Sequence, residues 1–256
     1  MGIHPPPERD RLPALAVVLD VSSSMTADDF APQNRLEEAK KHLKEFISSA
    51  GEVELGLILF AASPQLAVPV TFDHDAVRDA LQKARTAGFN NDGTALGSAI
   101  ASAVNRLRDG PWSKRRILLI TDGVNNSGPV SPLDAARIAS AFGITIDAIG
   151  IGTDSVSRFW IPTQDESFAE LEARIEIDDK MLADLTRETA GTYHRVRNSS
   201  ELREALRSLE RLPAPPASVQ SAAARFRWSR ILSIAAILLL AVEFLLSRFT
   251  FSELPG

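Results

Sequence analysis

The chain has 256 residues, 45% of them hydrophobic, which is enough for one large α/β domain and an appendage. Its 28 basic and 33 acidic residues give a formal net charge of −5, which argues against nonspecific nucleic-acid binding. There is no cysteine, so disulfides and thiolate metal sites are excluded, although the redox compartment is not decided.

The chain begins with a polar, proline-rich stretch, and we expect residues 1–13 to be a disordered lead-in without the apolar segment of a signal peptide. Residues 14–20 are a continuous apolar run that ends at Asp20, which predicts a central parallel strand buried on both faces. Ser22 and Ser24 follow at once. Because the carboxyl ends of such strands face the ligand crevice, these three side chains are predicted to lie there.

Strands and helices then alternate as far as residue 212. We predict helices at 35–50, capped by Asn34, and at 75–87, 94–107, 134–142, 179–190 and 199–212. We predict strands at 52–60, 65–70, 116–121, 144–151 and 191–196. Pro69 places the strand 65–70 at an antiparallel edge. The alternation predicts a doubly wound, Rossmann-like α/β domain with a mostly parallel sheet and one antiparallel edge strand.

Two further oxygen-bearing side chains occur at similar places in this pattern. Thr94 follows the turn 90–93 and opens a predicted helix, and Asp122 ends the strand 116–121. Carboxylates and hydroxyls are hard oxygen donors, which suit a cation such as Mg²⁺. Taken singly, each residue has an ordinary alternative as a helix cap or turn former. The five residues together predict a metal site.

The segment 153–175 has the weakest secondary-structure pattern in the chain, and we interpret it as an insertion with one short helix. It contains Trp160 and an Ile161–Pro162 pair. The four histidines form no ligand-spaced pair, and we expect surface roles for them; they are His4, His42, His74 and His194.

A proline-rich linker at 213–227 is predicted to lead into a transmembrane helix at 228–247, followed by a short tail at 248–256. The alternative is an amphipathic or buried helix that packs on the domain. Three arginines precede this segment and one, Arg248, follows it closely. The positive-inside rule then predicts a single-pass protein of the inner membrane with its domain in the cytoplasm.

Three motifs carry a family resemblance: Asp20-x-Ser22-x-Ser24, Thr94 after a glycine turn, and Thr121-Asp122-Gly123 after a strand. Their order and spacing resemble the metal-ion-dependent adhesion site (MIDAS) of von Willebrand factor A domains, and the resemblance extends over about residues 15–212. The stretch 121–136 is similar to bacterial membrane proteins of the BatA/BatB type, whose genes often accompany MoxR-type ATPases.

This resemblance implies a function as well as a fold. It implies a Mg²⁺ site, with Mn²⁺ or Ca²⁺ as alternatives, whose open position accepts an acidic residue from a partner protein. The implied ligands are Asp20, Ser22, Ser24, Thr94 and Asp122. A MoxR-type AAA+ ATPase and other membrane proteins with the same domain are the implied partners, in complex assembly or stress tolerance.

Two other functions are weighed against this binding module. One is a structural subunit of a membrane complex in which the metal site has no role in binding. The other is a phosphatase-like hydrolase, because a strand of this chain that ends in Asp-x-Ser, together with Thr-Asp-Gly after a later strand, resembles the pattern of such enzymes. That chemistry normally needs a second aspartate where this chain has Ser22, and the sequence contains no P-loop, no Gly-x-Ser-x-Gly motif and no His-Glu-x-x-His motif. We therefore expect that the protein is not an enzyme.

Overall fold

The computed structural model describes residues 12–165 and 167–209. The predicted linker, transmembrane helix and tail lie outside the described residues, as does most of the lead-in. Leu12 and Pro13 are an exception: both are buried, and their carbonyl groups accept hydrogen bonds from the backbone of Ser113 and Glu54. Within the described part of the chain no helix is long and apolar enough to cross a membrane.

The core of the fold is a six-stranded sheet with the order β3-β2-β1-β4-β5-β8. Its strands are β1 (Ala14–Asp20), β2 (Glu54–Phe60), β3 (Pro64–Thr71), β4 (Arg115–Thr121), β5 (Ile144–Ile151) and β8 (Tyr193–Val196). All pairs are parallel except β2 with β3, which forms the predicted antiparallel edge. The mostly parallel sheet and its antiparallel edge strand are therefore confirmed.

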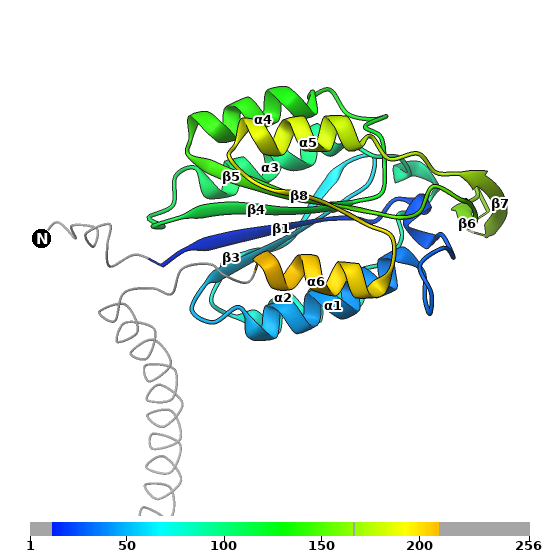
Figure 1. Ribbon diagram of the computed structural model, residues 1–256, viewed down its shortest axis with the longest axis horizontal. Helices are drawn as coiled ribbons and strands as arrows, with labels where there is room; N and C mark the ends of the chain where they lie inside the picture. Colours follow the sequence, from blue (N-terminus) through cyan, green and yellow to red (C-terminus); the bar gives the residue numbers. More distant parts are fainter. Residues whose placement is uncertain (1–11, 166, 210–256) are drawn as a thin grey trace, which may run out of the picture. The chain divides into compact units, whose positions relative to one another are not determined.

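Helices cover both faces of this sheet (Figure 1). One face carries α1 (Arg35–Ser49), α2 (His74–Lys83) and α6 (Ser199–Leu209), and the other carries α3 (Leu96–Leu107), α4 (Pro132–Ala141) and α5 (Asp179–Glu188). Every residue of β1 is buried, because it is the central strand between two apolar layers. This explains its uninterrupted apolar sequence.

Local signals set the helix boundaries. The Asn34 side chain accepts a hydrogen bond from Glu37 N at 2.8 Å, which confirms the predicted cap of α1. In α3, small residues allow a close approach: a Cβ on Gly97 would lie 2.0 Å from the carbonyl oxygen of Val130. Several predicted helix bounds were wrong. Helix α2 ends at Lys83 rather than at residue 87, and α3 begins at Leu96 rather than at Thr94. Helix α4 begins at Pro132 rather than at residue 134, and α5 ends at Glu188 rather than at residue 190.

The segment 153–175 contains no helix in its described residues, so that expectation was wrong. It forms a two-stranded antiparallel sheet of β6 (Val156–Pro162) and β7 (Phe168–Arg174), which we call the hairpin. The hairpin projects from the end of the domain opposite the start of β1 (Figure 1). Apolar and polar residues partly alternate along both strands. However, exposed charged residues occupy many positions, and this weakens the hydrophobic periodicity that would predict a strand.

The predicted surface role of the histidines was wrong for His42. This residue of α1 is 1% exposed, and its Nε2 lies 2.8 Å from Ser199 Oγ at the start of α6. His42 therefore joins two helices beneath the sheet.

Candidate metal centre

Four of the five predicted site residues lie at or just after the ends of two strands, at the topological switch point of the sheet. The chain leaves β1 toward β2 on one side and later returns to β4 on the other, so β1 and β4 are neighbours. Asp20 ends β1, and Asp122 directly follows β4. Both side chains are therefore placed at the carboxyl edge of the sheet, where a crevice opens in folds of this kind.

Hydrogen bonds fix the orientation of the Asp20 carboxylate. Its Oδ1 accepts from Ser22 N at 2.9 Å, and its Oδ2 accepts from Thr121 Oγ1 at 2.6 Å. Asp20 is completely buried. The tight turn after β1 and the last residue of β4 thus hold this carboxylate in a single position.

The two serine hydroxyls bridge the two strands. Ser22 Oγ lies 3.0 Å from Ser24 Oγ, and Ser24 Oγ donates to Asp122 Oδ1 at 2.8 Å. Ser24 belongs to a 3₁₀ turn, Ser23–Thr26, which turns its hydroxyl toward β4. The structure thus brings Asp20, Ser22, Ser24 and Asp122 into one connected cluster.

Thr94 approaches this cluster from a loop and is not part of a helix. Its backbone N–H donates to Asn126 Oδ1 at 2.8 Å, and its carbonyl accepts from the backbone of Asn126 and Ser127. A Cβ on Gly123 would lie 3.2 Å from Thr94 Oγ1, so this hydroxyl lies against the residue after Asp122. The N-cap of α3 is Ala95, which leaves the Thr94 hydroxyl without a capping role.

Burial and mutual repulsion perturb the two acids. Burial, and then the charge of Asp122, raises the pKa of Asp20 to about 7. Burial also raises the pKa of Asp122, although Arg35 and the hydrogen bond from Ser24 oppose this shift. Within the described residues Asp20 has no ion-pair partner, whereas Asp122 pairs with Arg35, so a divalent cation would favour the charged form of Asp20 in particular.

Arg35 belongs to this site, and we did not predict it. Its side chain is completely buried; Nη1 pairs with Asp122 Oδ2 at 2.9 Å, and Nη2 pairs with Asp29 Oδ2 at 2.6 Å. Although burial alone would raise it, the contacts with Arg35 lower the pKa of Asp29 to about 2. A signal was present: Arg35 lies four residues before Ala39, on the buried face of α1.

Arg35 also links the metal-site cluster to the base of the hairpin. Asp29 Oδ2 accepts hydrogen bonds from Thr153 N at 2.9 Å and from Thr153 Oγ1 at 2.8 Å. Gly152 has φ +140°, and a Cβ there would lie 2.6 Å from Arg35 Cζ. The backbone before β6 therefore packs directly on the guanidinium group.

The donor set fits a hard divalent cation. Two carboxylates and three hydroxyls converge at the edge of the sheet, and all are oxygen ligands of the type that Mg²⁺, Mn²⁺ or Ca²⁺ takes. Among residues 12–165 and 167–209 there is no group of three or more His, Cys, Asp or Glu side chains that could hold a metal ion. Hydroxyls therefore have to complete any coordination here.

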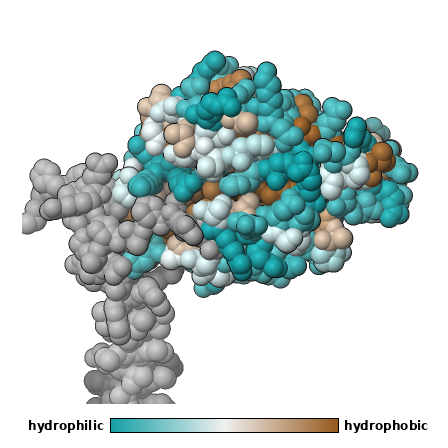
Figure 2. Space-filling view, viewed as in Figure 1, coloured by the Kyte–Doolittle hydropathy of each residue, from teal (hydrophilic) through white to brown (hydrophobic). Residues whose placement is uncertain are grey.

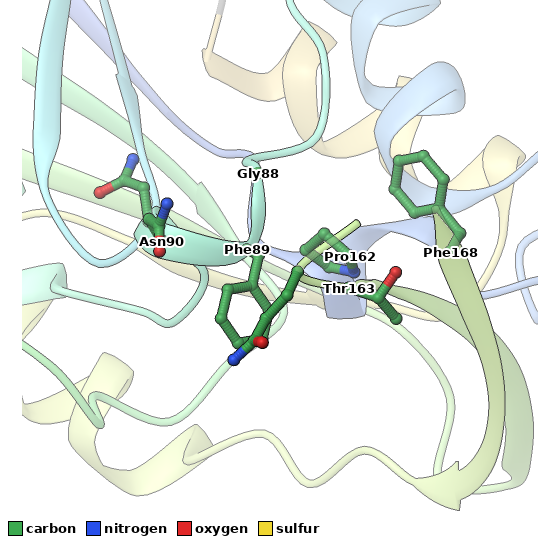
Figure 3. Close-up of a pocket in the computed structure, with 8 residues that line it drawn as sticks. Gly88, Phe89, Asn90, Pro162, Thr163 and Phe168 are labelled. Atoms are coloured by element: carbon green, nitrogen blue, oxygen red, sulfur yellow. The ribbon is translucent and has the colours of Figure 1, made fainter. Parts of the chain in front are cut away.

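A groove lies between the loop before Thr94 and the tip of the hairpin. It has a volume of about 460 Å³ and includes Phe89 from the loop with Pro162 and Phe168 from the hairpin (Figure 3). The next residues of this loop touch the cluster, because Asp92 Oδ1 accepts from Ser23 N at 2.8 Å. Phe89 and Phe168 are 47% and 58% exposed, so an apolar surface adjoins the candidate metal centre.

Comparison with known sequences agrees with this geometry. Residues 15–125 match the family described as von Willebrand factor type A domain. An uncharacterized protein of Borreliella burgdorferi is 27% identical over 240 residues, which are 94% of this chain and 70% of that protein. A UPF0353 protein of Mycolicibacterium paratuberculosis is 39% identical over 153 residues, which are 54% of this chain and 44% of that protein. In its matches to UPF0353 proteins, the chain spans between 44% and 63% of their length.

Solved structures share the fold. An aerotolerance-related membrane protein of Bacteroides fragilis superposes with a TM-score of 0.65 at 26% identity, covering 77% of this chain and 98% of the other. BatB of Bacteroides thetaiotaomicron has the same score and identity and is covered to 95%. Proximal thread matrix protein 1 of the mussel byssus, solved with zinc in its MIDAS motif, has a TM-score of 0.57 at 18% identity, covering 79% of this chain and 46% of the other. That last likeness concerns the fold alone.

Proposed function

Because this chain carries a von Willebrand factor type A domain with BatB among its structural neighbours, we propose that it binds a protein partner through a divalent cation. The observation that supports this proposal best is the hydrogen-bonded cluster at the switch point. Two fully buried carboxylates, Asp20 and Asp122, are linked there through the backbone N–H of Ser22 and the hydroxyls of Ser22 and Ser24. Such a cluster costs folding free energy unless its charges are compensated.

Several residues of this chain would coordinate the cation together. The hydroxyls of Ser22, Ser24 and Thr94 are direct ligands in this proposal, and the two aspartates bind directly or through water. A bound cation supplies a positive charge that accepts a carboxylate from the partner. Arg35 holds Asp122 Oδ2 and so keeps the other oxygen of that carboxylate turned toward Ser24.

We propose Mg²⁺ as the resident cation, with Mn²⁺ and Ca²⁺ as alternatives. Mg²⁺ prefers six oxygen ligands and usually keeps several waters, which leaves exchangeable positions for a partner. The zinc-occupied MIDAS motif of the mussel protein is a property of that protein, and its 18% identity transfers only the fold.

The partner in this proposal presents an acidic residue beside an apolar one. The acid would enter the metal centre, and the apolar side chain would lie in the groove formed by Phe89, Pro162 and Phe168. Figure 2 shows hydrophobic colour at the hairpin end of this view, as well as at several other places on a mostly hydrophilic surface. A MoxR-type AAA+ ATPase and other membrane proteins with the same domain remain the proposed partners.

We further propose a membrane-anchored protein of the inner membrane with its domain in the cytoplasm. The relatives from Bacteroides fragilis and Bacteroides thetaiotaomicron include one described as a membrane protein. The predicted anchor at 228–247 lies outside the described residues. We propose no enzymatic activity, since Ser22 stands where phosphatase chemistry would need a second aspartate.

The test is a pull-down from membranes with the full chain, either unchanged or carrying Asp20→Ala, in Mg²⁺ or in EDTA. We expect a partner to be retained only by the unchanged chain in Mg²⁺. Asp109→Ala is the matched control, because Asp109 is an exposed acid with an 80% exposed side chain. If the same partners are retained in all conditions, the cation does not bridge the two proteins and the structural-subunit alternative is favoured.

A further inference from the structure

The outer edge of the hairpin is an open strand. β7 pairs with β6 along seven residues without a bulge, and it pairs with no other strand in the described chain. β6 is covered on its other side, because Asp28 N donates to the Arg158 carbonyl at 3.0 Å and Trp160 N donates to Thr26 Oγ1 at 2.8 Å. Of the two strands of the hairpin, β7 is therefore the one that presents backbone N–H and C=O groups for further pairing.

The strand also lacks most of the features that usually block such an edge. Its sequence, Phe168–Arg174, contains no proline, and six of its seven residues are exposed. Leu171, at its centre, is 43% exposed. The charged residues of β7 are Glu170, Glu172 and Arg174, and their charges determine which partner strand can pair with this edge.

The free charge on this edge is acidic. Glu170 and Glu172 lie opposite Trp160 and Arg158 and share their face of the hairpin. Neither glutamate forms an ion pair within residues 12–165 and 167–209, because Arg158 pairs with Asp28. Arg174 is also engaged, since its Nε donates to the carbonyl oxygen of Asp154 at 2.7 Å.

The opposite face of the hairpin is apolar. Ala169, Leu171 and Ala173 of β7 face that way, opposite Ile161, Phe159 and the small polar residue Ser157 of β6. A strand added to β7 would therefore meet the two central carboxylates on one face, flanked by Phe168 and Arg174, and apolar side chains on the other. That arrangement selects a segment with alternating basic and apolar residues.

The same charges disfavour pairing of two copies of this chain. An antiparallel contact centred on Leu171 would place Glu170 of one copy opposite Glu172 of the other. Like charges directly opposite one another destabilise a sheet. A basic partner strand removes this conflict, whereas a second copy does not.

We propose that β7 accepts an extended segment of a partner protein in which Lys or Arg alternates with apolar residues, as an added third strand of the hairpin. This contact lies beyond the metal-dependent binding proposed above and does not require a cation. It would give the same end of the domain a second point of attachment, next to the groove of Figure 3.

The test uses the full 256-residue chain in mild detergent with EDTA, so that it is independent of the metal centre. The probe is an eight-residue synthetic peptide of alternating lysine and valine. We expect binding to slow hydrogen exchange at the β7 amides. We expect Glu170→Lys with Glu172→Lys to weaken binding about tenfold or more. A peptide of alternating glutamate and valine should then bind this double variant better than it binds the unchanged chain.

Two controls separate strand pairing from simple charge attraction. Glu188→Lys with Glu204→Lys makes the same charge change at exposed positions of α5 and α6 and should leave binding within about twofold. The second control uses peptides N-methylated on all lysines or on all valines. Because alternate residues of a strand hydrogen-bond to one neighbour, only one of these peptides should lose binding.

Three results would overturn the proposal. Equal binding of the two N-methylated peptides would show that backbone pairing is not involved. Equal weakening of peptide binding by both double variants would show that binding depends only on the net charge of the protein. A dimer of the full chain that dissociates on Glu170→Lys with Glu172→Lys would assign the edge to a second copy of the chain.

Discussion

The six-stranded sheet and the hairpin are held in different ways. The sheet lies between two layers of helices, and its central strand has no exposed residue. The hairpin is mostly exposed, and polar contacts from Thr26, Asp28 and Asp29 hold β6 and its base. The first region is stabilised by apolar burial, and the second by the loop that also carries the metal-site serines. The order of the hairpin should therefore depend on that loop.

The largest expected effect comes from replacing Arg35, whose buried guanidinium group joins the two regions. Arg35→Met keeps the apolar stem of the side chain but leaves Asp122 and Asp29 without their partner. We expect the free energy of unfolding to fall by about 3–5 kcal/mol, measured by urea denaturation. Hydrogen exchange should accelerate in β6 as well, because Asp29 anchors Thr153.

The matched control for Arg35→Met is Arg78→Met, which removes an exposed i,i+3 ion pair with Asp75. This change should cost no more than about 1 kcal/mol. Equal losses in the two variants would mean that the buried network does not stabilise the fold.

A second prediction contrasts one residue type in the two regions. Leu19 in β1 is completely buried, whereas Leu171 in β7 is 43% exposed. Leu19→Ala should lower the free energy of unfolding by about 2–5 kcal/mol, because it leaves a cavity in the core. Leu171→Ala should change it by less than about 0.5 kcal/mol. Similar values by urea denaturation would show that the hairpin contributes to the global core.

The two regions should also respond differently to pH. Asp20 has a pKa raised to about 7 by burial and by Asp122, so a proton competes with the cation below that pH. Mg²⁺ affinity, measured by calorimetry, should be about tenfold weaker at pH 6 than at pH 8. Binding of the lysine–valine peptide to β7 should vary little over this range, because the proposed strand pairing does not involve Asp20 or the cation. Mg²⁺ affinity that is constant with pH would remove Asp20 from the metal site.

The same pKa shift predicts the stability of the metal-free protein. The folded state holds the Asp20 proton more tightly than the unfolded chain does, since the pKa rises from 3.8 to about 7. The metal-free protein should therefore lose stability as the pH rises through that interval. Asp20→Asn should remove the part of this dependence that comes from Asp20 and leave the part from Asp122, whose pKa is also raised by burial, as measured by urea denaturation at several pH values.

The smallest expected effect concerns the contact between the site loop and the hairpin. Thr26 Oγ1 accepts from Trp160 N at 2.8 Å and lies 3.3 Å from the Trp160 carbonyl oxygen. Thr26→Val should lower the local stability of the hairpin by about 1 kcal/mol, seen as faster exchange of β6 amides with little change in β5. An equal increase in both strands would indicate global destabilisation instead.

The two regions also differ in how well the sequence predicts them. Buried strands such as β1 and β5 have apolar runs, and their predicted bounds agree with the structure. The order of the site motifs was sufficient to predict that Asp20, Ser22, Ser24 and Asp122 lie together, although their role as ligands stays a prediction. The hairpin was missed because exposed strands carry weak hydrophobic periodicity. Arg35 was missed because its role depends on Asp29 and Asp122, 6 and 87 positions away in the chain.

The pairing of Val156 with Arg174 has a consequence for protein engineering. Residues that pair in this way have Cα atoms only about 5 Å apart, so the two ends of the hairpin enter and leave the domain side by side. We therefore expect that a turn of two or three residues can replace the whole hairpin without altering the path of β5 or α5. Grafting the hairpin onto another domain of the same fold would transfer its open edge only together with the loop contacts from Thr26, Asp28 and Asp29.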